Sequence, residues 1–326
     1  VNTGSLQTKG WNLTFNTTNI ENKNFKWETN LNISHFKSIV TSLNSNNAFI
    51  ERSSWWMNNW TQRAAIGYEP WLFRGYVAEG LFQSTEEINK SAVPYDNSGN
   101  RRPTDPNTGI WIGDVKYKDL NGDGKIDVND MTNIGSPWPK FTGGFTNTFS
   151  CKGVELSILI TGSFGNKIYN YISQVSSNPN NINLSRNLLV NSMNYAKVIT
   201  DGNGNPVLSN PGKNVPRITS DQVAMDNDYN LISSMYVEDG SYVKLKNVSL
   251  SYNLPAKLLG YTKIIKGLRA TVGAQNLYTI TKYKGYDPEV GSYVGTGSSS
   301  ANQAIGIDFG RYPLTPMYTA AISVNF

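Results

Sequence analysis

The chain has 326 residues, a net charge of +5 and a single cysteine, Cys151. This length suits one large domain or two ordinary ones. With 38% hydrophobic residues and no apolar run long enough for a spanning helix, the chain is not a helical membrane protein. One cysteine excludes an internal disulfide, and the thinly spread positive charge gives no nucleic-acid signature. Aromatic residues make up 12% of the chain, which suits a protein whose Trp and Tyr lie at membrane interfaces.

Seven segments alternate between apolar and polar residues with period 2, which predicts β-strands. In the second of them, Phe25 and Trp27 alternate with Lys26 and Glu28. In chain order the segments are 6–17, 25–34, 141–150, 154–164, 241–254, 268–279 and 318–326. Two less regular segments, 71–82 and 110–118, are predicted either as two further spanning strands or as a hairpin standing above the membrane.

The last strand has one apolar face and ends the chain on an aromatic residue. Its apolar residues are Tyr318, Ala320, Ile322, Val324 and Phe326. Such a strand is typical of outer-membrane β-barrels, although the same face could pack on a soluble core in water. Because the pattern recurs along the chain, we predict a barrel, with Tyr318, Ile322, Val324 and Phe326 as its assembly signal.

The connections between the predicted strands alternate between short and long. The short ones are 18–24, 151–153 and 255–267, and the long ones are 35–70, 165–240 and 280–315. Short periplasmic turns and long outer loops are typical of transmembrane barrels. With Phe326 in the periplasm, either reading of the uncertain pair leaves an odd number of strands and places Val1 outside. Single-chain bacterial barrels have even strand numbers, so we expect an all-β, transmembrane antiparallel barrel of which residues 1–326 are the C-terminal portion.

Residues 119–130 have the ligand spacing of a calcium-binding loop. Positions 1, 3, 5, 7, 9 and 12 of such a loop would be Asp119, Asn121, Asp123, Lys125 (through its carbonyl), Asp127 and Asp130. Gly124 would form the sharp turn, and Asp130 stands where a Glu is usual. No helical pattern flanks the loop, so we predict structural Ca²⁺ and not a sensor. The alternative is a metal-free turn rich in Asx and Gly.

Several blocks of the chain resemble one family. The blocks are 113–127 (GDVKYKDLNGDGKID), 134–137, 141–145, 162–170 (GSFGNKIYN), 237–248 (VEDGSYVKLKNV) and 273–278 (GAQNLY). They resemble the C-terminal third of SusC/RagA-type TonB-dependent outer-membrane transporters. The resemblance implies a 22-strand barrel, with a plug and a TonB-contacting segment that this chain does not include. It also implies outer-membrane lipid around the barrel, a SusD-like lipoprotein as its lid, and energised import of oligosaccharides or peptides.

No residue constellation indicates an enzyme, because His35 is the only histidine and Cys151 has no catalytic partner. Four tryptophans lie in or beside the first long loop, and could stack on sugar rings or contact a lid protein. They are Trp55, Trp56, Trp60 and Trp71, with Phe73 nearby. The alternative is an interfacial girdle or a loop core. The alternative for the whole chain is a secreted, calcium-stabilised β-sandwich that binds carbohydrate, which would be soluble where a barrel would partition into detergent.

Overall fold

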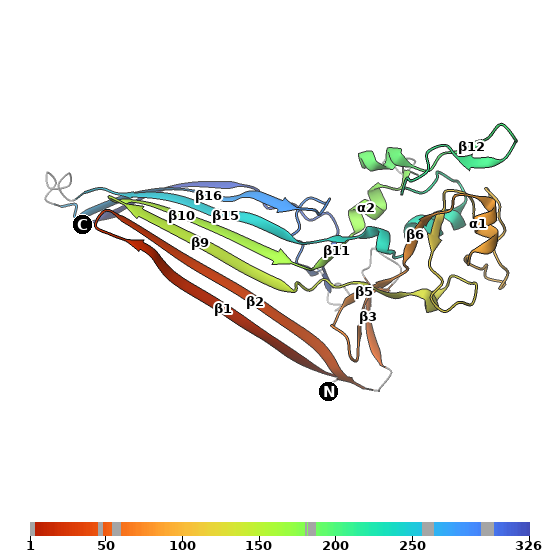
Figure 1. The fold of residues 1–326 in the computed structure, drawn as a ribbon, viewed down its shortest axis with the longest axis horizontal. Helices are drawn as coiled ribbons and strands as arrows, with labels where there is room; N and C mark the ends of the chain where they lie inside the picture. Colours follow the sequence, from red (N-terminus) through yellow and green to blue (C-terminus); the bar gives the residue numbers. More distant parts are fainter. Residues whose placement is uncertain are drawn as a thin grey trace.

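The computed structural model describes residues 4–44, 48–53, 60–179, 181, 187–255, 264–294 and 303–326. A long, curved antiparallel sheet extends from a compact body of loops (Figure 1). The seven strands of the sheet are, in spatial order, β1 (Gly4–Glu21), β2 (Phe25–Leu43), β9 (Phe141–Cys151), β10 (Val154–Phe164), β15 (Tyr242–Asn253), β16 (Gly267–Thr281) and β20 (Met317–Asn325). They correspond to the seven strands predicted from the alternation of residues.

Each strand of the sheet is antiparallel to its neighbour. The turn between β9 and β10 has only two residues, Lys152 and Gly153, with φ of 47° and 89°. Positive φ at both central positions matches the twist of a tight hairpin. We call the end of the sheet with the short connections the turn end, and the opposite end the loop end. The N and C labels lie at opposite ends of the sheet (Figure 1), as an odd number of strands requires.

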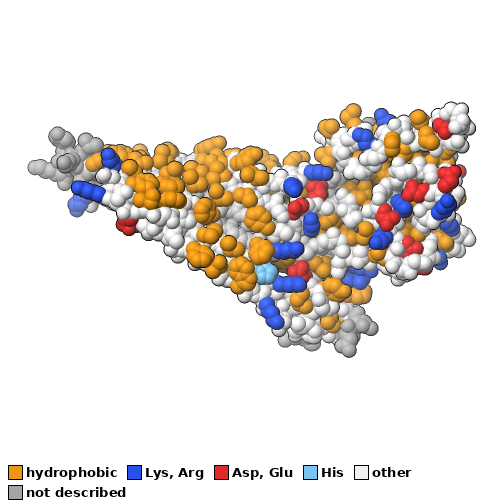
Figure 2. Space-filling model, viewed as in Figure 1, with side chains coloured by type: hydrophobic (Ala, Val, Ile, Leu, Met, Phe, Trp, Pro, Cys, Tyr) orange, Lys and Arg blue, Asp and Glu red, His pale blue; other side chains and the backbone are white. Residues whose placement is uncertain are grey.

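The two faces of the sheet differ in polarity. Leu156, Leu250 and Val272 lie opposite one another on β10, β15 and β16, and Leu250 and Val272 remain 45% and 55% exposed. Figure 2 shows hydrophobic side chains spread over the sheet and charged ones gathered on the loop body. On the other face, Arg269 forms an ion pair of 2.6 Å with Glu155. An exposed apolar face opposite a polar one is the pattern of a barrel wall, with lipid on one side and the lumen on the other.

The fold does not match the β-sandwich alternative. A sandwich buries one face of each sheet against a second sheet. Here Tyr318 and Ile322 on β20 are 74% and 75% exposed, and in the described part of the chain every other sheet has two to four short strands. Among the described residues, no helix has the length and apolar character needed to cross a membrane.

The second strand is longer than its alternation predicts, because β2 continues from Phe25 to Leu43. The prediction that a loop begins at residue 35 is therefore wrong. His35 lies within the strand, where its Nδ1 contacts the Lys140 carbonyl at 2.6 Å. Beyond this point Phe36 is exposed while Ile39 and Val40 are not. Strict alternation fails at this end of β2 because the strand lies next to the loop body, where its two faces are no longer one apolar and one polar.

The loop body contains the remaining elements. Its four-stranded sheet has the order β3 (Phe49–Ser53), β4 (Trp60–Ala65), β5 (Leu72–Gly75) and β8 (Thr132–Gly135). A three-stranded sheet consists of β14 (Val237–Asp239), β11 (Lys167–Asn170) and β19 (Ile307–Asp308). Three pairs are β6 (Ala78–Leu81) with β7 (Val115–Tyr117), β12 (Val198–Thr200) with β13 (Pro206–Leu208), and β17 (Ser292–Val294) with β18 (Gln303–Ile305). The helices are α1 (Thr85–Lys90), α2 (Tyr171–Ser176) and α3 (Gln222–Met225), with single turns at Val128–Asp130, Val190–Asn194, Asp226–Asn230 and Ser234–Tyr236.

This arrangement answers the question left open for 71–82 and 110–118. β6 pairs with β7, and β5 pairs with β4 and β8, so none of these strands belongs to the seven-stranded sheet. They are part of the loop body, as the hairpin alternative proposed. No regular alternation marks β5 and β7 because these two strands are largely buried on both faces.

The three long connections share one hydrophobic core. Phe73 comes from the first connection, which in the structure runs from β2 to β9; Tyr169, Ile232 and Tyr236 come from the second, and Ile307 from the third. Four of these side chains are at most 2% exposed. Two further clusters pack beside this core, centred on Tyr117 and Ile110. The three connections therefore pack together as one unit and are not three separate loops.

Candidate functional site

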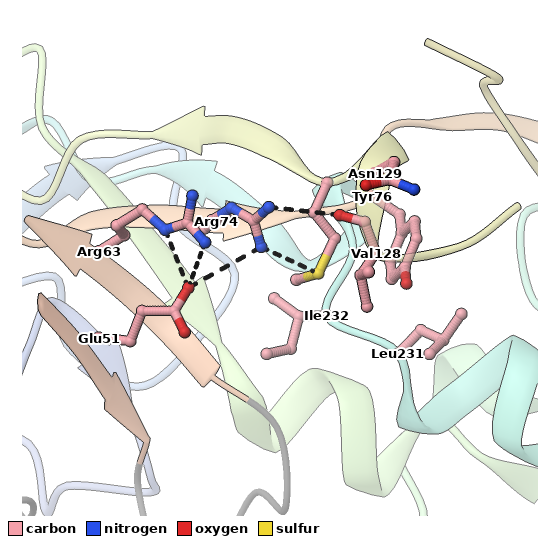
Figure 3. A pocket seen from close by; sticks show the side chains of 9 residues that line it. Glu51, Arg63, Arg74, Tyr76, Val128, Asn129, Leu231 and Ile232 are labelled. Carbon is pink, nitrogen blue, oxygen red and sulfur yellow. Dashed lines mark hydrogen bonds and ion pairs between the residues drawn. The ribbon is translucent and has the colours of Figure 1, made fainter. Parts of the chain in front are cut away.

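A cavity of about 320 Å³ lies in the loop body (Figure 3). Its charged lining residues are Glu51 from β3, Arg63 from β4 and Arg74 from β5. Tyr76, just after β5, also lines it. The rest of the lining is Val128, Asn129, Met131, Leu231 and Ile232. Two cations and one anion thus meet aliphatic side chains in one partly open cavity, a composition typical of small-molecule sites.

Arg63 is fixed in place by two contacts. Its Nε and Nη2 both donate to Oε1 of Glu51, at 2.9 and 2.6 Å. Its guanidinium also lies 3.9 Å from the centre of the Phe49 ring, which is a cation–π distance. Glu51 and Arg63 lie opposite each other on β3 and β4, so the strand pairing itself brings them together.

Arg74 is less well paired than Arg63. Its Nη1 donates to the Met131 sulfur and its Nη2 to the Val128 carbonyl, each at 3.3 Å, while Glu51 lies 4.0 Å away. Its side chain is only 16% exposed. Burial, and then the charge of Arg63, lower the pKa of Arg74. Arg74 therefore shares the Glu51 carboxylate with Arg63 at longer range, and a part-buried guanidinium paired this weakly can still bind an anion.

Tyr76 connects the cavity to the predicted calcium loop. Its side chain is 7% exposed, and burial, followed by the charges of Asp127 and Asp130, raises its pKa to about 12. The phenol is therefore a neutral hydrogen-bonding group at physiological pH. Val128 and Asn129, which line the cavity, belong to the same loop.

The Asp119–Asp130 loop is closed by its own hydrogen bonds. Asp119 accepts the amides of Gly122 and Gly124 at 2.7 and 2.9 Å, which lowers the pKa of this carboxyl. Gly124 has φ of +79°, as the predicted turn requires. Buried Asp130 accepts the amides of Leu120 and Asp127, at 2.8 and 2.9 Å, and so joins the two ends of the loop.

In this conformation the loop residues do not form a metal shell. Asn121 and Asp123 also accept backbone amides, at 3.0 and 2.8 Å, and Asn121 donates to Asp123. Within the described ranges, no group of three or more His, Cys, Asp or Glu side chains lies close enough to hold a metal ion. The Lys125 side chain instead lies over Tyr95, with its Nζ 4.8 Å from the ring centre. Ca²⁺ binding here stays a prediction.

The four predicted tryptophans are placed only in part. Trp55 and Trp56 lie outside the described residues, and Trp60 is described only as the first residue of β4. Trp71 has φ of 63°, and the guanidinium of Arg52 lies 3.4 Å from its ring centre. The Trp71 carbonyl accepts a hydrogen bond of 2.9 Å from Gln62. Trp71 is thus packed into the four-stranded sheet, while contact with substrate or lid stays a prediction for the whole group.

Three of the four predicted assembly residues lie on the edge strand β20, and the fourth, Phe326, directly follows it. Tyr318, Ile322 and Phe326 are 74–75% exposed, and Val324 is half-buried. β20 pairs with β16 on one side only, and its other edge is unpaired within the described part of the chain. An edge of this kind must pair before it can lie in a hydrocarbon environment.

A buried ionic group joins the first and second connections. Arg217 donates to Asp114 at 2.5 and 3.2 Å, and both side chains are nearly inaccessible. Asp228, also fully buried, accepts the Val115 amide at 2.8 Å. Burial raises the pKa of both Asp114 and Asp228, and the charge of Asp114 raises that of Asp228 further. The neutral form is therefore favoured more strongly at Asp228 than at Asp114, whose charge Arg217 stabilises.

Curated relatives align along the whole chain, whereas no protein-family model matches it. TonB-dependent receptors P3 and P26 of Formosa agariphila are each 31% identical, over 328 and 325 residues. TonB-dependent receptor SusC of Bacteroides thetaiotaomicron is 23% identical over 334 residues. Each alignment includes 100% of this chain but only 29%, 30% and 27% of the respective relative.

The fold agrees with these relatives. The structure of the RagAB peptide transporter matches 100% of this chain and 30% of its own, with a TM-score of 0.69 and 22% identity. Its 'open-open' state gives a TM-score of 0.64 at 20% identity. Over its whole length the chain is thus similar to TonB-dependent receptors of the SusC type, and its fold is that of the RagAB transporter. The predicted family and the all-β barrel fold are thereby confirmed, while the total of 22 strands stays a prediction.

The cavity of this SusC/RagA-type chain was missed by sequence reasoning. Glu51, Arg63 and Arg74 are single charged residues in short, irregular strands, and nothing in their spacing distinguishes them from surface charges. Only the pairing of β3, β4 and β5 brings them together. The buried pair Asp114 and Arg217 is separated by more than a hundred residues and gave no local signal either.

Proposed function

We propose that this chain forms part of a bacterial outer-membrane transporter that imports oligosaccharides or peptides in a TonB-dependent manner, together with a SusD-like surface lipoprotein. The main support is the alignment of the whole chain with proteins named TonB-dependent receptors. Because the chain spans less than a third of their length, TonB would act through a plug and a TonB-contacting segment outside these residues.

The sheet suits this role. Its apolar face would contact lipid and its polar face the lumen, with the turn end in the periplasm and the loop end outside the cell. The loop body then stands at the outer mouth of the barrel, where substrate and a lid protein arrive. RagAB is named a peptide transporter, which supports a two-component importer and keeps peptides among the candidate substrates.

No catalytic role is assigned in this proposal. The relatives are named as receptors, and the cavity combines arginines, a glutamate and aliphatic side chains without a paired nucleophile and base among its described lining residues. Its chemistry is that of binding.

Uptake tests the proposal directly. In a strain lacking the full-length protein, uptake of its growth oligosaccharide or peptide mixture should fall, and should return when the gene is restored. Uptake should also fall when tonB is deleted or a protonophore is added, and the protein should fractionate with the outer membrane. Uptake that continues without TonB, or a protein found in the soluble fraction, would contradict the proposal.

A further inference from the structure

The cavity contains a cation that the protein itself leaves poorly satisfied. A guanidinium has five N–H donors. Arg74 uses two of them in hydrogen bonds to described residues, and neither acceptor, a thioether sulfur and a carbonyl oxygen, is charged. Glu51 pairs with Arg63 at 2.6 Å and with Arg74 only at 4.0 Å, so the one carboxylate that lines the cavity is shared by two guanidiniums.

The same two arginines also line a second hollow of about 180 Å³. Tyr68, Leu72 and Asn133 also line this hollow. Both arginines therefore border two hollows, although Phe49 covers one side of the Arg63 guanidinium. A purely structural ion pair has no need of such access, whereas an anion-binding group does.

The remaining walls define what an anionic ligand must carry beside its charge. Val128, Met131, Leu231 and Ile232 offer aliphatic and thioether surface (Figure 3). A sugar acid carries a hydroxyl on nearly every ring carbon. Most of these hydroxyls would have no hydrogen-bond partner on this aliphatic surface, and burying them unpaired would weaken binding. A volume of about 320 Å³ lies at the small end of ligand pockets, so it fits the end of a chain and not a long segment.

We propose that this cavity binds the carboxylate end of a peptide, with Arg74 holding the carboxylate and the wall of Leu231 and Ile232 receiving an aliphatic terminal side chain. Arg63, fixed by Glu51 and Phe49, positions the site and adds to its positive potential. This inference rests on the proposed import function and assigns a substrate class to it. Glu51 competes with the ligand for the two guanidiniums.

Binding is measured on the intact detergent-purified transporter. The probe is the fluorescein-labelled tripeptide alanyl-alanyl-leucine with a free C-terminal carboxylate. The control is the same tripeptide with a C-terminal amide. Fluorescence anisotropy measures the affinity of each. The amide should bind about 10- to 100-fold more weakly, since a hydrogen bond to a charged group is lost. Arg74→Gln should weaken binding of the acid to the level of the amide and leave the amide unchanged.

Two further variants separate binding from a structural role. Lys197→Gln removes an exposed positive charge of the loop body away from the cavity, and should leave the difference between acid and amide intact. Glu51→Gln removes the competing carboxylate, and should tighten binding of the acid. Heat-modified gel mobility confirms that each variant is a folded barrel.

The inference is overturned if folded Arg74→Gln binds the acid as tightly as the unchanged protein does. It is also overturned if galacturonate, with galactose as its neutral control, binds in an Arg74-dependent way and the tripeptide does not. Uptake by the unchanged transporter distinguishes failure of the cavity assignment from failure of the proposed import function. Uptake without the predicted binding refutes only the cavity assignment, whereas loss of TonB-dependent uptake altogether refutes the import function.

Discussion

Leu250 and Val272 face each other across β15 and β16, and both project from the same exposed face of the sheet. Their chain neighbours Ser249 and Thr271 point to the opposite face. The Ser251 hydroxyl, on that second face, is 2.9 Å from the Thr271 hydroxyl. A single register thus separates an exposed apolar row from a polar row.

The first prediction tests this separation. Leu250→Arg or Val272→Arg should lower the free energy of unfolding by about 2–4 kcal/mol if the residue lies near the bilayer midplane. Ser249→Arg and Thr271→Arg are the matched controls and should cost less, because a lumen accepts charge. Urea titration of the intact transporter in vesicles measures both. Equal losses on both faces would point to a core buried on two sides.

The second prediction concerns the end of the chain. Removing Phe326, or replacing it with Asp, should reduce the amount of folded protein in the outer membrane, since β20 has an edge that must pair to close a barrel. Heat-modified mobility of the membrane fraction measures folded barrel. Asn325→Asp is the control, because Asn325 lies on the opposite side of the strand. Normal levels of the Phe326 variants would remove the assembly role.

The third prediction concerns the buried carboxyls. Since burial raises the folded-state pKa of Asp114 and Asp228 above the value of a free carboxyl, the folded state binds more protons than the unfolded state. Their contribution to stability is therefore present at acid pH and is lost as pH rises from about 4 through the folded-state pKa. Hydrogen exchange at the Val115 amide, which Asp228 accepts, should quicken over that range beyond the intrinsic rate.

Substitutions of this group should act in opposite directions. Asp228→Asn mimics the protonated form, so it should remove most of this pH dependence and preserve the loop body at pH 7. Arg217→Met leaves Asp114 buried without its cation and should cost about 3–5 kcal/mol. If both variants changed exchange at Val115 equally at every pH, the proton assignment would be wrong.

The fourth prediction is the calcium loop. We expect the full-length protein to bind Ca²⁺ through Asp119, Asn121, Asp123, Asp127, Asp130 and the Lys125 carbonyl, with a gain in thermal stability. Asp119→Asn with Asp123→Asn should abolish that gain, while Asp201→Asn, in a different loop turn, should not. Titration calorimetry after chelation measures binding. No heat of binding and no stabilisation would leave the loop as a turn held by Asx hydrogen bonds.

The sheet could be predicted from the sequence because one of its faces is apolar and the other polar, which produces strict alternation along each strand. Trp27 and Phe149, for example, lie on neighbouring strands with ring centres 5.7 Å apart, and each was recognised in its own dyad. The loop body could not be predicted in the same way. Phe73 and Ile307 share a core although they are far apart in sequence. The local alternation of apolar and polar residues cannot indicate such a long-range contact. The arginine cavity was missed for the same reason.

The common core of Phe73, Tyr169 and Ile307 affects how such a transporter could be re-engineered. Exchanging one outer loop for that of a relative would break packing that the other two loops depend on, so single-loop chimaeras should misfold at the cell surface. A functional exchange would need to transplant all three connections together, or be confined to exposed tips such as residues 201–205. Natural variation in what is imported would then be expected to accumulate at the tips and in coordinated changes across the shared core.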